Sequence, residues 1–339
     1  MALWHHARRM NRLSVLEFIR NQDAVWNLPH PLAEALARDF TDVDFVSPGS
    51  PAEADAALSE ADIVLGWAVR RDNFARARRL RWIQVTAASV TSLMFPELVQ
   101  SSVIVTNGRG IHAVSMAEHA LGVILAFARK LHLARDAQQR REWLAQEMWS
   151  GPPPFLDLAG ATLGLIGFGT IGRAIAERAR LLGMRVLAVR RHPAADPAPA
   201  DEQWGPDGLP ELLERSDWVV IVAPLTPETR GFIGAPQISR MRPGAVLINL
   251  GRGALVDEDA LAVALASGAI AGAGLDVFRN EPLPPSSPFW TMPQVILTPH
   301  VSGFGPRYWE RALEIFRRNL RAFLEGRPLE NVVDKSAGY

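Results

Sequence analysis

The chain has no cysteine, and only Lys130 and Lys335 are lysines among its 339 residues. The missing cysteine excludes disulfide bonds, thiolate nucleophiles and cysteine-based metal sites. The scarcity of lysine leaves no phosphate loop of the Gly-Lys-Ser/Thr type and only two poorly placed residues for a Schiff base. Kinase-like and pyridoxal-dependent chemistry is therefore disfavoured, and we predict no metal ion.

The chain also lacks an excess of either charge and lacks a long apolar run. The 36 Lys and Arg residues balance the 36 Asp and Glu residues. Nucleic acids and anionic membranes attract proteins with a large basic surplus, so we expect neither partner and predict a small-molecule partner. The longest apolar run, residues 120–128, is far shorter than the roughly 20 residues that cross a bilayer. The segment around Trp4 lacks a continuous apolar signal core, which predicts a cytoplasmic protein.

Two α/β regions are indicated by short apolar runs that alternate with Ala-rich stretches of helical period. The strands predicted for the first region are residues 14–18, 43–46, 63–66, 82–85 and 103–105. Those predicted for the second region are residues 162–166, 185–189, 218–222, 245–248, 272–275 and 295–297. The pattern predicts an α/β fold with two Rossmann-like domains, each a doubly wound parallel sheet.

Helices and a loop are predicted outside these strands. A long helix should follow His112 and end near residue 131, and a second should span residues 135–144. Residues 193–210 are rich in Pro, Ala and Asp, which predicts a surface loop. Residues 304–325 predict a last helix, which should return to the first region.

A glycine-rich segment follows the predicted strand 162–166 and precedes a helix-like stretch. Its residues are Gly167, Gly169, Thr170, Ile171 and Gly172. A strand that leads through glycines into a helix lets backbone N–H groups face a pyrophosphate, because no side chain blocks the approach. The next strand follows at βαβ spacing, so this segment predicts a dinucleotide site.

The residues at the end of the second strand bear on the choice of cofactor. NAD-specific enzymes usually place Asp or Glu roughly 20 residues beyond the fingerprint. This chain has Arg190 and Arg191 there, followed by His192. Two guanidinium groups suit a 2′-phosphate, so we predict NADP as the preferred cofactor and leave NAD open. The alternative is that both arginines are merely solvated basic residues.

An ordered series of motifs resembles the D-isomer-specific 2-hydroxyacid dehydrogenase family over nearly the whole chain. The motifs are Thr106-Asn107, Ala117-Glu118-His119, the glycine segment, Leu225-Thr226-Pro227-Glu228-Thr229, Met241-Arg242-Pro243-Gly244, Ile248-Asn249-Leu250-Gly251-Arg252-Gly253, Leu275-Asp276-Val277-Phe278, Glu281-Pro282 and Thr298-Pro299-His300. The closest appearance is to glyoxylate/hydroxypyruvate reductases.

The resemblance implies two domains with different roles. Residues 1–106 and 302–339 would form the substrate domain. Residues 107–301 would form the NAD(P)-binding Rossmann domain, with the active site in the cleft between the domains. A helical arm within residues 113–151 would join two copies into a homodimer.

Three residues are candidates for the chemistry. Arg252 can bind a carboxylate and polarise a carbonyl oxygen with its planar fork, and it matches the family's substrate arginine. His300 can give a proton during reduction and take one during oxidation. Glu281 would pair with His300, because a nearby carboxylate favours the imidazolium form. The family's formate-oxidising members carry glutamine in this role, so Glu281 argues for a hydroxy or oxo acid. The alternatives are a surface salt bridge for Arg252, a structural histidine and a loop glutamate.

Other positions are assigned by the resemblance. Backbone N–H groups of Ala88, Ser89 and Val90 could hold the substrate's carboxylate, although Ser89 and Thr91 replace the family's usual glycine and aspartate. The loop with Pro224, Thr226 and Thr229 would lie against the cofactor. Asp276 would lie near the nicotinamide, or would instead hold the domain geometry through hydrogen bonds.

We therefore predict NAD(P)H-dependent reduction of a small 2-oxo acid, similar to glyoxylate or hydroxypyruvate, to the D-2-hydroxy acid. His300 would be the acid/base and Arg252 the substrate anchor. The alternative is a nucleotide-sensing binding protein, because the family includes transcriptional corepressors that keep the catalytic set.

Overall fold

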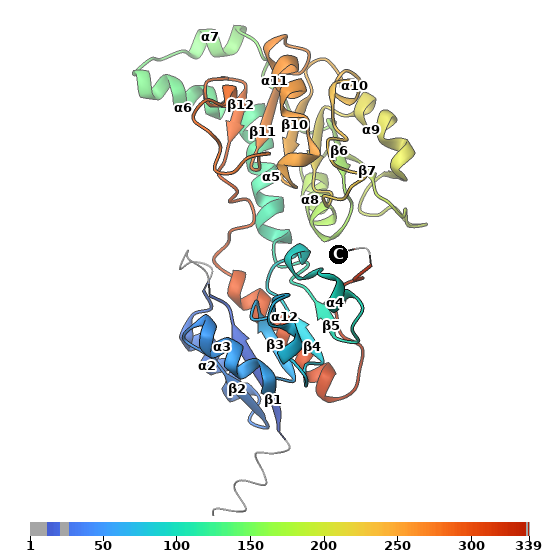
Figure 1. Ribbon diagram of the computed structural model, residues 1–339. Coiled ribbons are helices and arrows are strands. Elements are labelled where there is room, and N and C mark those ends of the chain that lie inside the picture. Colours follow the sequence, from blue (N-terminus) through green and yellow to red (C-terminus); the bar gives the residue numbers. More distant parts are fainter. Residues whose placement is uncertain (1–11, 21–26, 337, 339) are drawn as a thin grey trace, which may run out of the picture. The chain divides into compact units, whose positions relative to one another are not determined.

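The computed structural model describes residues 12–20, 27–336 and 338. The chain divides into two compact units, Met1–Ile111 with Pro306–Tyr339, and His112–Gly305 (Figure 1). Residues 1–11, on which the prediction about a signal core rests, lie outside the described residues. Within the described part of the chain, no helix is long and apolar enough to span a membrane. The functional roles predicted for the two regions remain predictions.

The first unit contains a five-stranded parallel sheet in the order β2-β1-β3-β4-β5, a doubly wound order. Its strands are β1 (Leu13–Phe18), β2 (Val43–Val46), β3 (Ile63–Gly66), β4 (Trp82–Gln84) and β5 (Ile104–Thr106). Its helices are α2 (His30–Asp39), α3 (Pro51–Ala57), α4 (Pro96–Val99) and α12 (Tyr308–Leu324). Apolar clusters on both faces bury the sheet against α2 and α12 on one side and α3 and α4 on the other.

The last helix packs on this sheet, as its sequence predicted, although it begins at Tyr308 and not at residue 304. Its Phe316 and Phe323 stack on Trp82 of β4, with ring centroids 5.3 Å and 5.5 Å apart. The indole Nε1 of Trp82 donates to Thr106 Oγ1 at 2.7 Å, so this large buried side chain also has its polar atom satisfied.

The second unit contains a seven-stranded parallel sheet in the order β12-β11-β10-β9-β6-β7-β8. Its strands are β6 (Thr162–Ile166), β7 (Arg185–Val189), β8 (Glu202–Trp204), β9 (Trp218–Ile221), β10 (Val246–Asn249), β11 (Gly272–Leu275) and β12 (Val295–Leu297). Its longer helices are α5 (Ala113–Ala128), α6 (Leu131–Arg140), α7 (Ala145–Ser150), α8 (Thr170–Leu181), α9 (Leu209–Arg215), α10 (Ala235–Ile238) and α11 (Glu258–Ala266). The chain runs outward from β6 through β7 to β8 and then crosses to β9 on the other side, so the strand order reverses at β6.

Every predicted strand is present, with each end within one residue of the prediction. Alternate side chains of β6, β7 and β9 enter two different apolar clusters, one formed with α5 and α8 and the other with α9, α10 and α11. Because both faces of the sheet are buried, its strands are continuous apolar runs, which made them visible in the sequence. The predicted α/β class with two doubly wound sheets is confirmed.

The predicted loop at residues 193–210 was wrong in part, because it contains the edge strand β8. Leu187 of β7 pairs with Glu202 in a parallel register. This strand has three residues, none of them buried, and Glu202 forms ion pairs with Arg185 and Arg215. A short, polar edge strand carries no apolar run by which a pattern could find it.

The predictions for two helices were also wrong. The first was expected to end near residue 131, and the second was expected to span residues 135–144. Helix α5 stops at Ala128, and α6 occupies Leu131–Arg140. The break lies at Lys130, which has a positive φ of 54° and is only 1% exposed. Its Nζ donates to the carbonyl oxygens of Met148 and Gly151, near the end of α7. These tertiary contacts end the helix without the glycine or proline that a sequence would reveal.

Candidate active site

The glycine segment follows β6, at the point where the strand order reverses. Gly167 has a φ of +101°, and a Cβ there would lie 2.7 Å from the carbonyl carbon of Val222. A Cβ at Gly172 would lie 2.3 Å from the Gly167 oxygen, so α8 packs too closely on the turn for any side chain. A Cβ at Gly169 would meet nothing within 4 Å, so there is open space beside this residue. Thr170 and Ile171 follow it as the first two residues of α8. A tight turn, an open approach and close helix packing fit a dinucleotide pyrophosphate.

The two arginines predicted to recognise a 2′-phosphate follow β7. The backbone N–H of Arg190 donates to the Trp204 oxygen of β8 at 3.0 Å, which fixes the start of this turn. An Nη2 atom of Arg191 lies 3.6 Å from Glu228 Oε2, and both side chains are well exposed. Sequence reasoning missed this carboxylate, because it comes from a different loop. A hydrogen bond with Thr226 lowers the pKa of Glu228, and the charge of Arg191 acts in the same direction.

The loop after β9 is closed by a hydroxyl group. Thr229 Oγ1 donates to the carbonyl oxygen of Pro224 at 2.8 Å and accepts a hydrogen bond from the Thr226 N–H at 2.7 Å. The hydroxyl of Thr229 therefore shapes the loop. Contact between this loop and a cofactor remains a prediction.

Arg252 lies in a tight turn after β10. The side chain of Asn249 holds this turn, because its Nδ2 donates to the Arg252 oxygen at 3.0 Å and its Oδ1 accepts from the Gly251 N–H at 3.1 Å. Gly253 must be glycine, since a Cβ would lie 1.9 Å from the carbonyl carbon of Phe278. The Arg252 side chain is exposed and donates to its neighbour Gly251 at 2.7 Å. It forms no ion pair within the described residues, contrary to the surface salt-bridge alternative.

His300 and Glu281 are in direct contact. His300 Nδ1 lies 2.7 Å from Glu281 Oε2, and Glu281 Oε1 accepts a hydrogen bond from the Phe278 N–H at 2.8 Å. The carboxylate is therefore held by backbone on one side and holds the imidazole on the other. The side chain of His300 is 49% exposed, and Nε2 is the ring nitrogen left for exchange of a proton with a ligand.

The three candidates follow adjacent strands of the sheet. Arg252 follows β10, Glu281 follows β11 and His300 follows β12, and these strands are neighbours. Phe278 connects them, because its backbone contacts Gly253 beside Arg252 and its N–H holds Glu281. The sheet therefore brings a cationic fork and a carboxylate-held imidazole to the edge where ligands of open α/β sheets bind. Their catalytic roles remain predictions.

Asp276 is fully buried at the end of β11. Its Oδ1 accepts hydrogen bonds from Thr298 Oγ1 at 2.6 Å and from the Val301 N–H at 2.9 Å, and its Oδ2 accepts from the Ser302 N–H at 2.9 Å. These hydrogen bonds hold the segment after β12, whereas the alternative that Asp276 holds the domain geometry and the contact with the nicotinamide both remain predictions. His119 and Thr298, which meet here, stood in the recognised motifs but were not singled out as site residues.

The predicted substrate loop lies in the first unit. The carbonyl oxygens of Thr86, Ala87 and Ala88 accept hydrogen bonds from Tyr308 Oη at 3.2 Å, the Gly108 N–H at 2.8 Å and Asn107 Nδ2 at 2.9 Å. In a trans peptide the N–H points away from the carbonyl, so the N–H groups of Ala88 and Ser89 point away from these donors. Ala88 and Ser89 are exposed, whereas Val90 is buried. The hydroxyl groups of the unusual Ser89 and Thr91 lie 3.1 Å apart.

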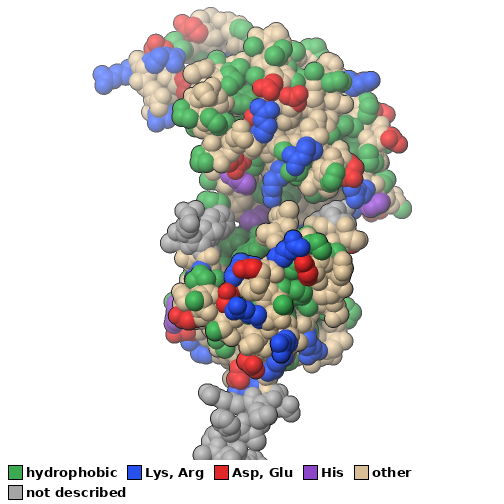
Figure 2. All heavy atoms as spheres, in the orientation of Figure 1, with side chains coloured by type: hydrophobic (Ala, Val, Ile, Leu, Met, Phe, Trp, Pro, Cys, Tyr) green, Lys and Arg blue, Asp and Glu red, His purple; other side chains and the backbone are tan. Residues whose placement is uncertain are grey.

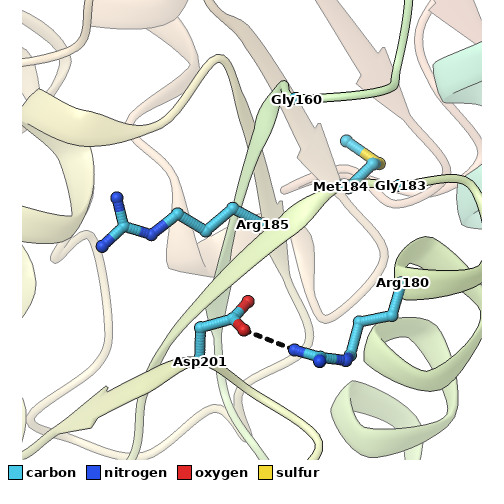
Figure 3. A pocket seen from close by; sticks show the side chains of 6 residues that line it. All are labelled: Gly160, Arg180, Gly183, Met184, Arg185 and Asp201. Atoms are coloured by element: carbon cyan, nitrogen blue, oxygen red, sulfur yellow. Dashed lines mark hydrogen bonds and ion pairs between the residues drawn. The ribbon is translucent and has the colours of Figure 1, made fainter.

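A polar pocket elsewhere in the second unit contains none of these residues. Arg180 donates to Asp201 within it, and Arg185 lies beside them at the first residue of β7 (Figure 3). Arg185, and with it the pocket, is thus at the opposite end of β7 from Arg190. Figure 2 shows positive and negative side chains interspersed over the face drawn, so neither sign dominates that face.

Comparison with known proteins gives a consistent result. The model for the NAD binding domain of D-isomer specific 2-hydroxyacid dehydrogenases matches residues 121–302. The chain is 38% identical over 268 residues to glyoxylate reductase from Thermococcus gammatolerans, covering 77% of this chain and 78% of that enzyme. It is 33% identical over 280 residues to D-3-phosphoglycerate dehydrogenase from Methanocaldococcus jannaschii, covering 82% of this chain but only 52% of that enzyme.

A solved structure supports the fold over nearly the whole length. NADPH-dependent glyoxylate/hydroxypyruvate reductase from Sinorhizobium meliloti, in complex with NADP and sulfate, superposes with a TM-score of 0.79 at 28% identity. The match covers 97% of this chain and 100% of that one.

Proposed function

The chain belongs to the D-isomer specific 2-hydroxyacid dehydrogenase family and is an oxidoreductase, and from this premise we propose that it reduces a small 2-oxo acid to the D-2-hydroxy acid with NADPH. Glyoxylate and hydroxypyruvate are the proposed substrates, since relatives named for them share 28% to 38% of its sequence. The single observation that carries the proposal is the 2.7 Å contact between His300 and Glu281 at the end of β12.

Each residue has one task in this reaction. NADPH, when bound, supplies a hydride to the carbonyl carbon. His300 donates a proton from Nε2 to the carbonyl oxygen, while Glu281 fixes the ring through Nδ1. Arg252 binds the carboxylate and polarises the carbonyl oxygen, because several of its N–H groups remain for a ligand. The backbone N–H groups of Ala88, Ser89 and Val90 are a further proposed site for a carboxylate.

The residues that would hold the cofactor follow β6, β7 and β9. The glycine segment takes the pyrophosphate at the N-terminus of the 12-residue helix α8. Arg190 and Arg191 bind the 2′-phosphate, a role supported by the relative whose structure contains NADP. Binding requires Arg191 to exchange its exposed contact with Glu228 for the phosphate, which carries more charge.

Replacing Arg190 with aspartate should move cofactor preference from NADPH toward NADH. Loss of one charge-assisted hydrogen bond changes affinity by about tenfold to a hundredfold, and the new carboxylate also repels the 2′-phosphate. The measurement is the ratio of kcat/KM for NADPH and NADH, with Arg240→Asp as a control at an exposed arginine that pairs with Glu214. A wild-type enzyme that uses NADH tenfold better than NADPH would contradict the preference.

We also propose a homodimer through the arm that contains α6 and α7. Trp143 is 93% exposed and Trp149 is 77% exposed, and large aromatic side chains at such positions are typical of interfaces. Sedimentation at micromolar concentration should show a dimer, and Trp143→Ser with Trp149→Ser should shift it toward the monomer. Val263→Ser, which changes an exposed apolar residue of α11, should not. A wild-type monomer at that concentration refutes the proposal.

The deciding experiment for the function is steady NADPH consumption on a panel of 2-oxo acids, with the chirality of each product determined. Turnover that His300→Ala and Arg252→Ala both abolish supports the reductase. Tight NADPH binding without turnover of any panel member would instead favour a nucleotide-sensing binding protein.

A further inference from the structure

A chain of side-chain hydrogen bonds passes through Thr298, close in sequence to the candidate acid/base His300. Thr298 Oγ1 lies 2.6 Å from Asp276 Oδ1 and 3.2 Å from His119 Nε2. His119 lies on α5, the fully buried Asp276 directly follows β11, and Thr298 directly follows β12. Three separate elements therefore meet through one hydroxyl group, two residues before His300.

The direction of these hydrogen bonds is determined by the groups themselves. A hydroxyl has one proton, and Thr298 gives it to the Asp276 carboxylate, which can only accept. Toward His119 the same oxygen must accept, so His119 carries its proton on Nε2. Burial lowers the pKa of His119, with the charge of Asp276 acting against this, so the ring is neutral at neutral pH.

The backbone beside His300 is arranged around the same carboxylate. The N–H groups of Val301 and Ser302 donate to Asp276 Oδ1 and Oδ2, and the His300 N–H donates to the Asp276 carbonyl oxygen at 2.8 Å. His300 itself has a φ of 55°, in the left-handed region that a residue with a side chain seldom adopts. Such a conformation persists where surrounding contacts determine it.

We propose that His119, Thr298 and Asp276 form a hydrogen-bonded chain that positions His300 for proton transfer. This inference rests on the proposed function, in which His300 Nε2 exchanges the proton. The side chain of His300 is half-exposed and is held by Glu281, so the direction of its Cα–Cβ bond depends on the backbone of residues 298–302. In this proposal His119 and Thr298 act on the reaction only through that backbone.

The decisive variant is Thr298→Val, which keeps the shape of the side chain and removes the hydroxyl. We expect kcat to fall by about tenfold to a hundredfold, since a displacement of 1 Å costs about that much, while the Kd for NADPH stays unchanged. Thr298→Ser keeps the hydroxyl and should retain most of kcat. Thr291→Val, which removes an exposed hydroxyl bonded to the Pro288 oxygen, is the matched control and should leave kcat unchanged.

Histidine NMR of the cofactor-bound protein gives a second measurement that needs no turnover. In wild type, 15N labelling should show the Nε2–H form of His119, and the His300 signals should shift in Thr298→Val but not in Thr298→Ser. Should Thr298→Val fail to fold, His119→Gln, which retains a donor, should keep both kcat and the His300 signals better than His119→Phe.

The proposal is overturned if Thr298→Val keeps the kcat and the His300 signals of wild type, or if Thr298→Ser is as impaired as Thr298→Val. It is also overturned if His119 carries its proton on Nδ1. A wild-type protein that reduces no 2-oxo acid would refute the proposed function, whereas the NMR comparison would still decide whether the chain of hydrogen bonds positions His300.

Discussion

His300→Ala should lower kcat/KM for the preferred 2-oxo acid by about 10² to 10⁴ fold, the usual contribution of a positioned general acid. The carbonyl oxygen gains negative charge as the hydride arrives, and in this variant only water is left to protonate it. The Kd for NADPH should be unchanged, because His300 follows β12 whereas the glycine segment follows β6. Stopped-flow single turnovers, together with fluorescence titration of NADPH, measure the two effects separately.

Glu281→Gln tests whether the charge of the partner matters or only its hydrogen bond. Glutamine can still accept from His300 Nδ1 but carries no charge, and a hydrogen bond to a charged group contributes about 1.5 to 3 kcal/mol. We expect a loss in kcat/KM between those of wild type and His300→Ala, with the Kd for NADPH unchanged.

The first unit supplies a matched control for the same pair of groups. His30 Nδ1 lies 3.3 Å from Glu34 Oε1 on the exposed surface of α2. His30→Ala removes an imidazole from a carboxylate partner far along the chain from the proposed chemistry, so it should leave turnover unchanged. Turnover that survives His300→Ala would mean that another group supplies the proton.

The sequence located the strands closely because both sheets are buried on two faces. Strands such as β6 and β9 are continuous apolar runs, and each ended within one residue of its prediction. The edge strand β8 and the break at Lys130 depend on contacts with other segments. These are an ion pair of Glu202 with Arg215, and hydrogen bonds from Lys130 to the carbonyl oxygens of Met148 and Gly151. No local pattern encodes such contacts.

The part of the candidate site that the sequence predicted consists of residues that come after a strand. Arg252 and His300 each lie in the short segment after a strand, so topology alone placed them at the same edge of the sheet. The Glu228 contact with Arg191 and the bridge from His119 through Thr298 join segments that are distant in sequence. Only the fold brings these groups together, although Glu228, His119 and Thr298 each stood in a recognised motif.

Arg252→Lys should be nearly as inactive as Arg252→Ala, with kcat/KM for the 2-oxo acid lower by about a hundredfold or more in both variants. A planar guanidinium binds a carboxylate through two parallel hydrogen bonds, each of which contributes about 1.5 to 3 kcal/mol when charged groups are involved. A lysine ammonium keeps the charge but not the fork, so it cannot replace both bonds.

Protein stability should not account for this loss. The Arg252 side chain is exposed and forms no ion pair within the described residues, and the turn beneath it is held by Asn249 and Gly253. Exposed substitutions of this kind usually change stability by less than about 0.5 kcal/mol, so the thermal midpoint should match that of wild type. Arg279→Lys changes another exposed arginine, which follows β11 and pairs with Asp259, and should keep full activity.

The substrate series separates the two tasks proposed for Arg252. For an aldehyde that lacks the carboxylate, Arg252→Ala loses only polarisation of the carbonyl oxygen. The kcat/KM of this variant should therefore fall by less for the aldehyde than for glyoxylate. If Arg252 bound only the carboxylate, the aldehyde would be reduced equally well by wild type and Arg252→Ala. If Arg252→Lys reduced glyoxylate as well as wild type does, a point charge would be sufficient, and the planar fork would have no part in substrate binding.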